Sequence, residues 1–251
     1  MLPLNKQNEY RRRYRALNPA WQSSGEAFEQ IVRGSINSAT RLLDLGGGRG
    51  GLIEKIYPRV GVATALDPDF SSLAGHRAPA VPRICGLAEH LPFLANSFHV
   101  VTALWLLEHL PDPPTVFREI HRILQPNGLF IFLTPNTLHP LLTTNNLSRL
   151  FPRLQRALVP RLYARAEEDT FPVRYRANTP GALRALCQQT GFNLRLHFIA
   201  DPTYTAFNDS LFHLSVFIER FIPASFKIHL VGVALKKTPG VSETPGIQHS
   251  T

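Results

Sequence analysis

The chain has 251 residues, 44% of them hydrophobic, and a formal net charge of +9. This length suits one domain with a sizeable core, and two cysteines far apart in sequence exclude a disulfide framework or a Cys-x-x-Cys metal site. The charge suggests an anionic partner, which is nucleic acid, a membrane surface or an acidic substrate. No apolar run of about 18 residues is present, so no membrane span is expected. The basic N-terminus lacks a signal peptide's apolar core, so we expect a cytoplasmic location.

The first predicted elements lead up to a glycine-rich loop. Residues 1–35 are expected to form a helical N-terminal arm, in which Ser24 caps a helix. The apolar stripe of that helix is Phe28, Ile31 and Val32. The continuous apolar run at 40–46 predicts a buried strand. Five glycines follow within the six positions 46–51, and such a loop lets a ligand approach the backbone closely.

Strands and helices alternate after the loop. A short helix ends at Pro58, and a longer helix at 111–124 has prolines in its first turn and is ended by Asn127-Gly128. Strands are expected at 61–67, 99–107 and 128–135. The alternation indicates an α/β fold with a doubly wound parallel sheet. The tail at 238–251 lacks apolar residues and is expected to be disordered.

The glycine loop admits more than one ligand. No lysine followed by a hydroxyl residue comes after the glycines, which excludes the phosphate loop of nucleoside triphosphatases. Gly46, Gly48 and Gly51 fit the dinucleotide pattern, and Asp67, 21 residues after Gly46, would accept hydrogen bonds from ribose hydroxyls. Asp44 argues against a dinucleotide, because its carboxylate would repel a pyrophosphate and favour a ligand with an ammonium group.

Motifs downstream of the loop narrow the choice. They are "AEHLPF" at 88–93, "NSF" at 96–98, "LEHLPDP" at 107–113 and Pro-Asn-Gly at 126–128. With Asp44-x-Gly-x-Gly-x-Gly, they make residues 40–136 resemble the class I S-adenosylmethionine-dependent methyltransferases, specifically the UbiE/UbiG-like group (methyltransferase type 11). The resemblance implies a Rossmann-like seven-stranded sheet closed by antiparallel strands at 191–200 and 225–237. It places a methyltransferase domain at 36–237, with a lid insertion at about 137–178.

The resemblance also implies the cofactor S-adenosyl-L-methionine and assigns residues to it. Asp67 would hold the ribose, and Trp105 and Leu106 would flank the methyl-donor end. Leu87 stands where relatives often carry an aspartate, so Glu89 is the candidate partner of the adenine amino group. The assigned residues are Asp44, Gly46, Gly47, Gly48, Gly50, Asp67, Pro68, Ala88, Glu89, Trp105 and Leu106.

A candidate base follows the third predicted strand. His109 stands where an acceptor would lie and is a possible general base, although such a histidine often only packs in the next turn. Glu108 and His109 together provide too few ligands for a metal ion, and none is expected. Catalysis needs no further group, because the sulfonium is already an activated leaving group and the enzyme mainly orients the acceptor.

The acceptor is predicted only by class. Neither an Asn-Pro-Pro-Tyr/Phe motif nor a Pro-Cys nucleophile is present, so nucleic acid is not expected as a partner. Segment 147–165 combines an apolar stripe with arginines, and segment 207–222 is strongly apolar. Two interpretations stay open: a lid packed on the sheet, or a membrane-facing entrance for a lipophilic substrate. The sequence therefore predicts O- or C-methylation of a small, lipophilic molecule. The alternatives are an NAD(P)-dependent oxidoreductase and a non-catalytic interaction protein whose pocket is filled by side chains such as Leu87.

Overall fold

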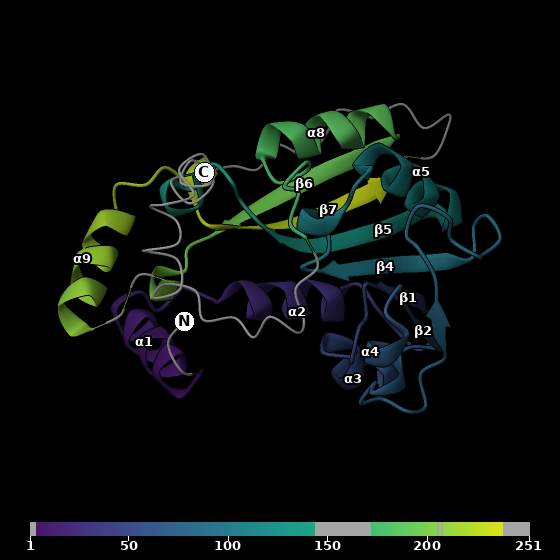
Figure 1. Cartoon of the computed structure of the whole chain (residues 1–251), viewed down its shortest axis with the longest axis horizontal. Helices are drawn as coiled ribbons and strands as arrows, with labels where there is room; N and C mark the ends of the chain where they lie inside the picture. Colours follow the sequence, from purple (N-terminus) through teal and green to yellow (C-terminus); the bar gives the residue numbers. More distant parts are fainter. Residues whose placement is uncertain (1–3, 144–171, 205, 207, 238–251) are drawn as a thin grey trace, which may run out of the picture.

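The chain folds around one seven-stranded sheet. The computed structural model describes residues 4–143, 172–204, 206 and 208–237. The strands lie side by side in the order β3-β2-β1-β4-β5-β7-β6 (Figure 1). Their bounds are β1 Arg41–Leu45, β2 Val62–Asp67, β3 Arg83–Cys85, β4 Phe98–Leu104, β5 Leu124–Pro135, β6 Phe192–Ile199 and β7 His229–Lys236.

The strand directions confirm the predicted doubly wound architecture. Neighbouring strands from β3 to β5 are parallel, whereas β7 is antiparallel to both β5 and β6. The two antiparallel strands predicted at the end of the chain are therefore present as β6 and β7. After β3, at one edge of the sheet, the chain returns to β4 beside β1, so the winding of the sheet reverses between β1 and β4.

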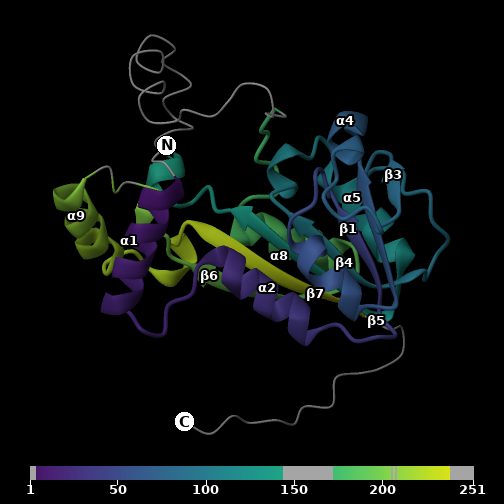
Figure 2. The same cartoon turned by 90° about the horizontal axis from the view of Figure 1, so that it is seen from below.

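Helices cover both faces of the sheet. Phe28 and Val32 of α2 join the core cluster on one face, and Phe117 of α5 and Leu183 of α8 join the cluster on the other. Figure 2 shows α2 along the underside of the sheet, where it packs against β5 and β7. The helices are α1 Leu4–Leu17, α2 Ser24–Gly34, α3 Leu52–Ile56, α4 Phe70–Ala74, α5 Pro113–Ile123, α8 Pro180–Gln189 and α9 Asp209–Glu219.

Two predicted helix ends are wrong. The cap of α2 is Ser23, not Ser24, because the Ser23 side chain and Glu26 form a reciprocal capping box. Helix α5 ends at Ile123, before Asn127-Gly128, since Leu124 already pairs with Phe98 as the first residue of β5. The Asn127-Gly128 pair instead bends β5 where its register with β4 shifts, and Asn127 has the positive φ that such a bend requires.

A smaller cluster lies beyond one end of the sheet. Tyr10 and Tyr14 of α1 pack with Phe212 and Val216 of α9. Figures 1 and 2 both place α1 and α9 beyond the sheet end toward which β4 points. The residues predicted as an N-terminal arm thus divide between this cluster, which contains α1, and the sheet, which α2 covers. In the described ranges, no helix is long and apolar enough to cross a membrane.

Candidate functional site

The carboxyl ends of β1, β2 and β4 bring the predicted residues to one edge of the sheet. The glycine loop follows β1, Asp67 is the last residue of β2, and Trp105 and Leu106 follow β4 directly. Because β1 and β4 are adjacent where the winding of the sheet reverses, a crevice for a ligand is expected at this position. The site is therefore in the place where open α/β sheets bind their ligands.

The glycine loop lies tightly against β2. The Gly46 and Gly47 amides both donate to the Leu66 carbonyl, at 2.8 and 3.2 Å. A Cβ on Gly47 would come within 3.1 Å of the Ala65 Cβ, so a side chain there would crowd β2. Gly48 differs, because its φ is +47° and a Cβ on it would meet only the Asp67 Oδ2, at 3.8 Å. Gly48 therefore borders open space beside Asp67, as a ligand cradle requires.

Asp67 holds the loop and faces that space. This buried carboxylate accepts hydrogen bonds from the Gly48 amide at 2.9 Å and from the Asp69 amide at 2.8 Å. A carboxylate has about four lone-pair positions, so these two bonds leave further positions for ligand hydroxyls. Pro68, which follows, is exposed. The carboxylate is thus placed to orient the loop and to accept bonds from a diol at the same time.

Asp44 lies beneath the loop on β1. Its Oδ1 accepts a hydrogen bond from the Thr102 hydroxyl at 2.8 Å, across the register pair that joins β1 and β4. Burial raises the pKa of Asp44 to about 6, the Thr102 hydrogen bond lowers it, and the nearby negative charge of Asp67 raises it. Both effects that raise the pKa would be relieved by a cation close to the carboxylate. The electrostatics of Asp44 therefore suit a ligand ammonium group.

Residues 87–89, which follow β3, are the ones expected to border the adenine end of the site. Ala88 is buried and Glu89 is half-buried, whereas Leu87 is 56% exposed. Leu87 therefore does not fill a pocket, as it would in a non-catalytic interaction protein. The expected adenine contacts of Ala88 and Glu89 stay predictions.

Trp105 and Leu106 lie between the glycine loop and β7 and contact both. Trp105 has a φ of +57°, which is rare for a bulky residue and is found most often at functional sites. Its amide donates to the Leu133 carbonyl at 2.9 Å, and its ring lies edge-on to His229 with the ring centres 5.0 Å apart. Leu106 lies over Gly46, where an added Cβ would be 3.2 Å from its Cδ1.

Glu108 and His109 contact the returning end of the insertion. The buried Glu108 carboxylate accepts from the Thr134 hydroxyl at 3.0 Å, and the Glu108 carbonyl accepts from the amides of Arg174 and Tyr175. His109 Nδ1 lies 3.4 Å from the Pro172 carbonyl. A catalytic role for His109 stays a prediction, whereas the anchoring role of Glu108 was not foreseen from the sequence.

Asn178, near the end of the insertion, is hydrogen-bonded to residues at and just before the start of the insertion. Its side-chain Nδ2 donates to the Thr134 hydroxyl at 2.6 Å, and its backbone carbonyl accepts from the Thr137 amide at 2.8 Å. Both ends of the insertion are therefore fixed at the site edge of the sheet. The basic stripe predicted at 147–165 and the tail predicted at 238–251 lie outside the described residues. Among the residues that are described, no three His, Cys, Asp or Glu side chains are grouped to hold a metal ion.

Comparison with known proteins identifies the domain that contains these residues. A family model described as "Methyltransferase domain" matches residues 43–132, which run from β1 through the glycine loop to β5. Over these residues the chain is a methyltransferase domain. Asp44, the loop and Asp67 all lie within the matched residues, and the cofactor is S-adenosyl-L-methionine.

Relatives and solved structures agree with this family. The chain is 29% identical over 192 residues to a ubiquinone/menaquinone biosynthesis C-methyltransferase of Methylobacterium nodulans, covering 70% of this chain and 73% of that protein. It is 34% identical over 106 residues to a ubiquinone biosynthesis O-methyltransferase of Pseudomonas syringae, covering 38% of this chain and 44% of that protein. In fold it resembles a Streptomyces coelicolor geranyl diphosphate C-methyltransferase solved with S-adenosyl-L-homocysteine, with a TM-score of 0.58, 11% identity and 85% and 77% of the two chains covered.

Proposed function

We propose that this methyltransferase transfers the methyl group of S-adenosylmethionine to an oxygen or carbon atom of a small, lipophilic molecule. The observation that carries the proposal is the open space that Gly48 borders beside Asp67. Asp67 would accept bonds from the ribose hydroxyls, and Asp44 would accept one from the ammonium group of the cofactor. The Ala88 amide and Glu89 would meet the adenine.

Catalysis in this proposal is mainly a matter of orientation. The bound sulfonium supplies an activated methyl group. Trp105 and Leu106 form the wall beside the methyl-donor end, and the fixed base of the insertion helps to exclude water. Holding two reactants in line can contribute roughly 7–11 kcal/mol of barrier lowering. No strong base is required for this contribution, so His109 remains only a candidate for deprotonating a hydroxyl acceptor.

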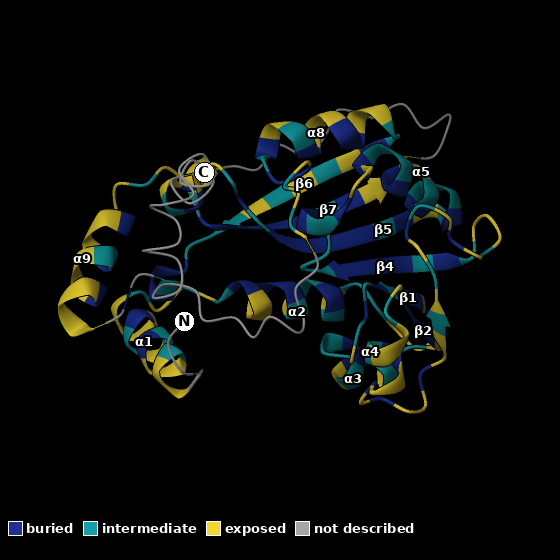
Figure 3. Cartoon of the chain, in the orientation of Figure 1, coloured by how far each residue is buried: buried dark blue, intermediate teal, exposed yellow. Residues whose placement is uncertain are grey.

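The lipophilic acceptor is inferred from the surface of α9. Its outward side chains are apolar, with Phe217 56% and Ile218 48% exposed, and Phe221 just beyond the helix is 71% exposed. In Figure 3 the outer side of α9 is largely coloured as exposed. This surface lies at the sheet end that carries the cofactor region. The names of the two relatives, which belong to ubiquinone and menaquinone biosynthesis, support the same acceptor class.

We propose further that α9 contacts an anionic membrane surface. Helix α1, which packs against α9, carries five basic residues and one acid. The two acids of α9 are already paired, Asp209 with Arg13 and Glu219 with Lys227. Exposed aromatic side chains beside a cationic helix are the combination that peripheral membrane helices use. The face would bring the site to an acceptor dissolved in the lipid.

Ligand-dependent stability tests the cofactor assignment. S-adenosylmethionine and S-adenosylhomocysteine should raise the melting temperature, because a ligand that binds only the folded state stabilises it. NAD and NADP serve as the comparison. Stabilisation by NAD or NADP alone would favour the oxidoreductase alternative, and no stabilisation by any of the four would favour a non-catalytic protein.

A further inference from the structure

The second half of the glycine loop, residues 49–51, is attached to the segment that follows α4. The Arg49 carbonyl accepts a hydrogen bond from the Arg77 amide at 3.0 Å. The first half of the loop is instead attached to β2, and Asp67 holds Gly48 between the two halves. The loop therefore has a second attachment besides the one that β2 provides.

Glu54 links the same segment to the loop through its side chain. It lies in the first turn of α3, and its Oε1 is 2.8 Å from Arg77 Nε and 2.7 Å from Arg77 Nη2. A Cβ on Gly50 would come within 2.9 Å of the same oxygen. The hydrogen bond from Arg77 lowers the pKa of Glu54, and the Gly51 amide lowers it further. One carboxylate therefore lies against the loop and holds the Arg77 guanidinium.

The segment that carries Arg77 is itself fixed to the body of the protein. The neighbours of Arg77, His76 and Ala78, are both buried, and His76 Nδ1 accepts a hydrogen bond from the Ala78 amide at 3.1 Å. Ala78 belongs to the same core cluster as Ile53 and Ile56 of α3. The backbone at Arg77 is thus anchored, whereas the Arg77 side chain, 58% exposed, meets Glu54 at the surface.

We infer that the Arg77–Glu54 pair positions the glycine loop for cofactor binding, by keeping residues 49–51 in the shape that leaves the space at Gly48 open. The inference rests on the proposed function, which places the cofactor beside Asp67. Arg77 and Glu54 act through the loop, so both are positioning residues. An ion pair as exposed as this one adds little to the free energy of unfolding. Its effect should therefore appear in cofactor affinity and not in stability.

The affinity of the whole chain for S-adenosylhomocysteine, measured by isothermal titration calorimetry, tests the inference. Arg77→Met removes the guanidinium and keeps the backbone amide that binds Arg49, and Glu54→Gln removes the charge of the partner. Each variant should raise the Kd about fivefold, as residues that act on a site without touching the ligand do. The double variant should bind no more weakly than either single variant, because the two residues act as one unit. Arg77→Lys should recover most of the affinity, because both Arg77 nitrogens meet a single oxygen that an ammonium group can also reach.

Lys55→Met is the matched control. Lys55 is next to Glu54 on α3 and forms an ion pair of similar exposure with Glu29 of α2, so its loss should leave the Kd unchanged. The urea midpoints of all these variants should stay close to the wild-type value.

Four outcomes would overturn this inference and leave the proposed function standing. They are wild-type affinity in Arg77→Met and Glu54→Gln, losses that add in the double variant, Arg77→Lys binding as weakly as Arg77→Met, and a urea midpoint that falls together with the affinity. If the wild type does not bind S-adenosylhomocysteine, the proposed function fails and this inference fails with it.

Discussion

A single carboxylate, Asp67, fixes the loop and is the group that we propose to bind the ribose. Its two oxygens hold the amides of Gly48 and Asp69, so the glycine loop and the turn after β2 are both fixed to it. The same oxygens face the space that Gly48 leaves open. Replacing Asp67 should therefore affect both the order of the loop and the affinity for the cofactor.

Asp67→Ala should weaken S-adenosylhomocysteine binding by at least tenfold. The reason is the loss of charge-assisted hydrogen bonds to ribose, each worth roughly 1.5–3 kcal/mol. Isothermal titration calorimetry would measure the affinity, with circular dichroism to verify folding. Asp69→Ala, which removes only the cap of α4, is the matched control and should bind nearly as the wild type does. Unchanged affinity in folded Asp67→Ala would remove the ribose assignment.

Asp44 should make both stability and cofactor affinity depend on pH. Its folded-state pKa of about 6 is above the unfolded value of roughly 3.9, so ionisation costs the folded state stability. The contribution of this group is fully present below about pH 4 and is lost as the pH rises through about 6. The carboxylate that an ammonium group needs, in contrast, is present only above that pKa.

Asp44→Asn should therefore raise the stability of the folded protein while lowering its affinity for the cofactor. We expect it to be more stable than the wild type by about 1–3 kcal/mol near pH 8, with the difference vanishing near pH 4, as measured by urea unfolding. Its affinity for S-adenosylhomocysteine should be lower near pH 8, and the wild-type affinity alone should fall as the pH drops below about 6. A variant that is no more stable near pH 8 would contradict the raised pKa.

At the scale of elements, α9 differs from α5, which covers the sheet. Helix α5 buries its apolar residues in the sheet core, and its Phe117 is fully buried. Helix α9 buries Phe212 against α1 but exposes Leu214, Phe217 and Ile218 on its other side. Helical periodicity alone does not distinguish these cases, because the segment 207–222 is apolar around most of its circumference.

Phe217→Ser with Phe221→Ser should abolish membrane binding and spare the cofactor site. The wild type should co-sediment with phosphatidylglycerol vesicles at low salt and be released by high salt. Each buried phenyl ring contributes about 1.5–3 kcal/mol, so the double variant should lose binding at least tenfold. Leu94→Ser is the matched control, since Leu94 is 83% exposed in a loop before β4, at the opposite end of that strand. Wild-type protein that ignores the vesicles at low salt would show that α9 has another role.

At the scale of the whole molecule, two cores meet at the site. The sheet and its helices form the large core, whereas Tyr10, Tyr14, Phe212 and Val216 form the small one beyond the carboxyl ends of the strands. The stacked pair Tyr10 and Phe212, with ring centres 4.9 Å apart, is central to the small core. A small core of this kind is expected to open independently of the sheet.

Tyr10→Ala should loosen α1 and α9 together. Truncating a buried aromatic costs about 3–5 kcal/mol, and the variant also removes the hydrogen bond from the Tyr10 hydroxyl to Asp209. Hydrogen exchange should show faster exchange of α1 and α9 amides, with β4 and β5 as protected as in the wild type. Equal loss of protection in the strands would mean that the molecule opens as one cooperative unit.

Most strands and the glycine loop were predictable from the sequence, because they depend on residues that are neighbours in the chain, whereas the cofactor contacts of single residues stay predictions. A buried strand is a continuous apolar run, and a parallel sheet brings strand tips to one edge, so Asp44, Asp67 and Trp105 could be assigned to one site by counting along the chain. The resemblance to a family supplied the cofactor. The short strand β3 escaped prediction because three residues show no periodicity.

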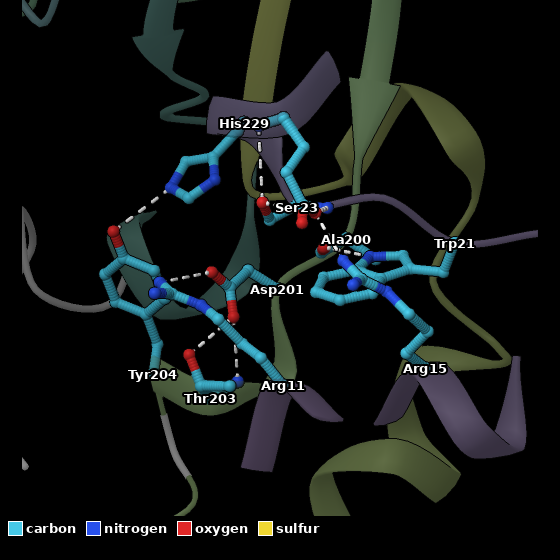
Figure 4. A network of polar contacts seen from close by, with 10 residues as sticks. Arg11, Arg15, Trp21, Ser23, Ala200, Asp201, Thr203, Tyr204 and His229 are labelled. Carbon is cyan, nitrogen blue, oxygen red and sulfur yellow. Dashed lines mark hydrogen bonds and ion pairs between the residues drawn. The ribbon is translucent and has the colours of Figure 1, made fainter. Parts of the chain in front are cut away.

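Only the tertiary structure could bring together Arg11, Asp201, Tyr204 and His229. Their partners are set by how α1, the β6–α9 connection and β7 pack around the end of the sheet (Figure 4), and no spacing in the sequence records that packing. The same holds for Glu108 and Asn178, which become partners of Thr134 because β5 ends between them. Contacts between distant segments depend on packing, whereas caps, strand runs and glycine turns depend on neighbours in the chain.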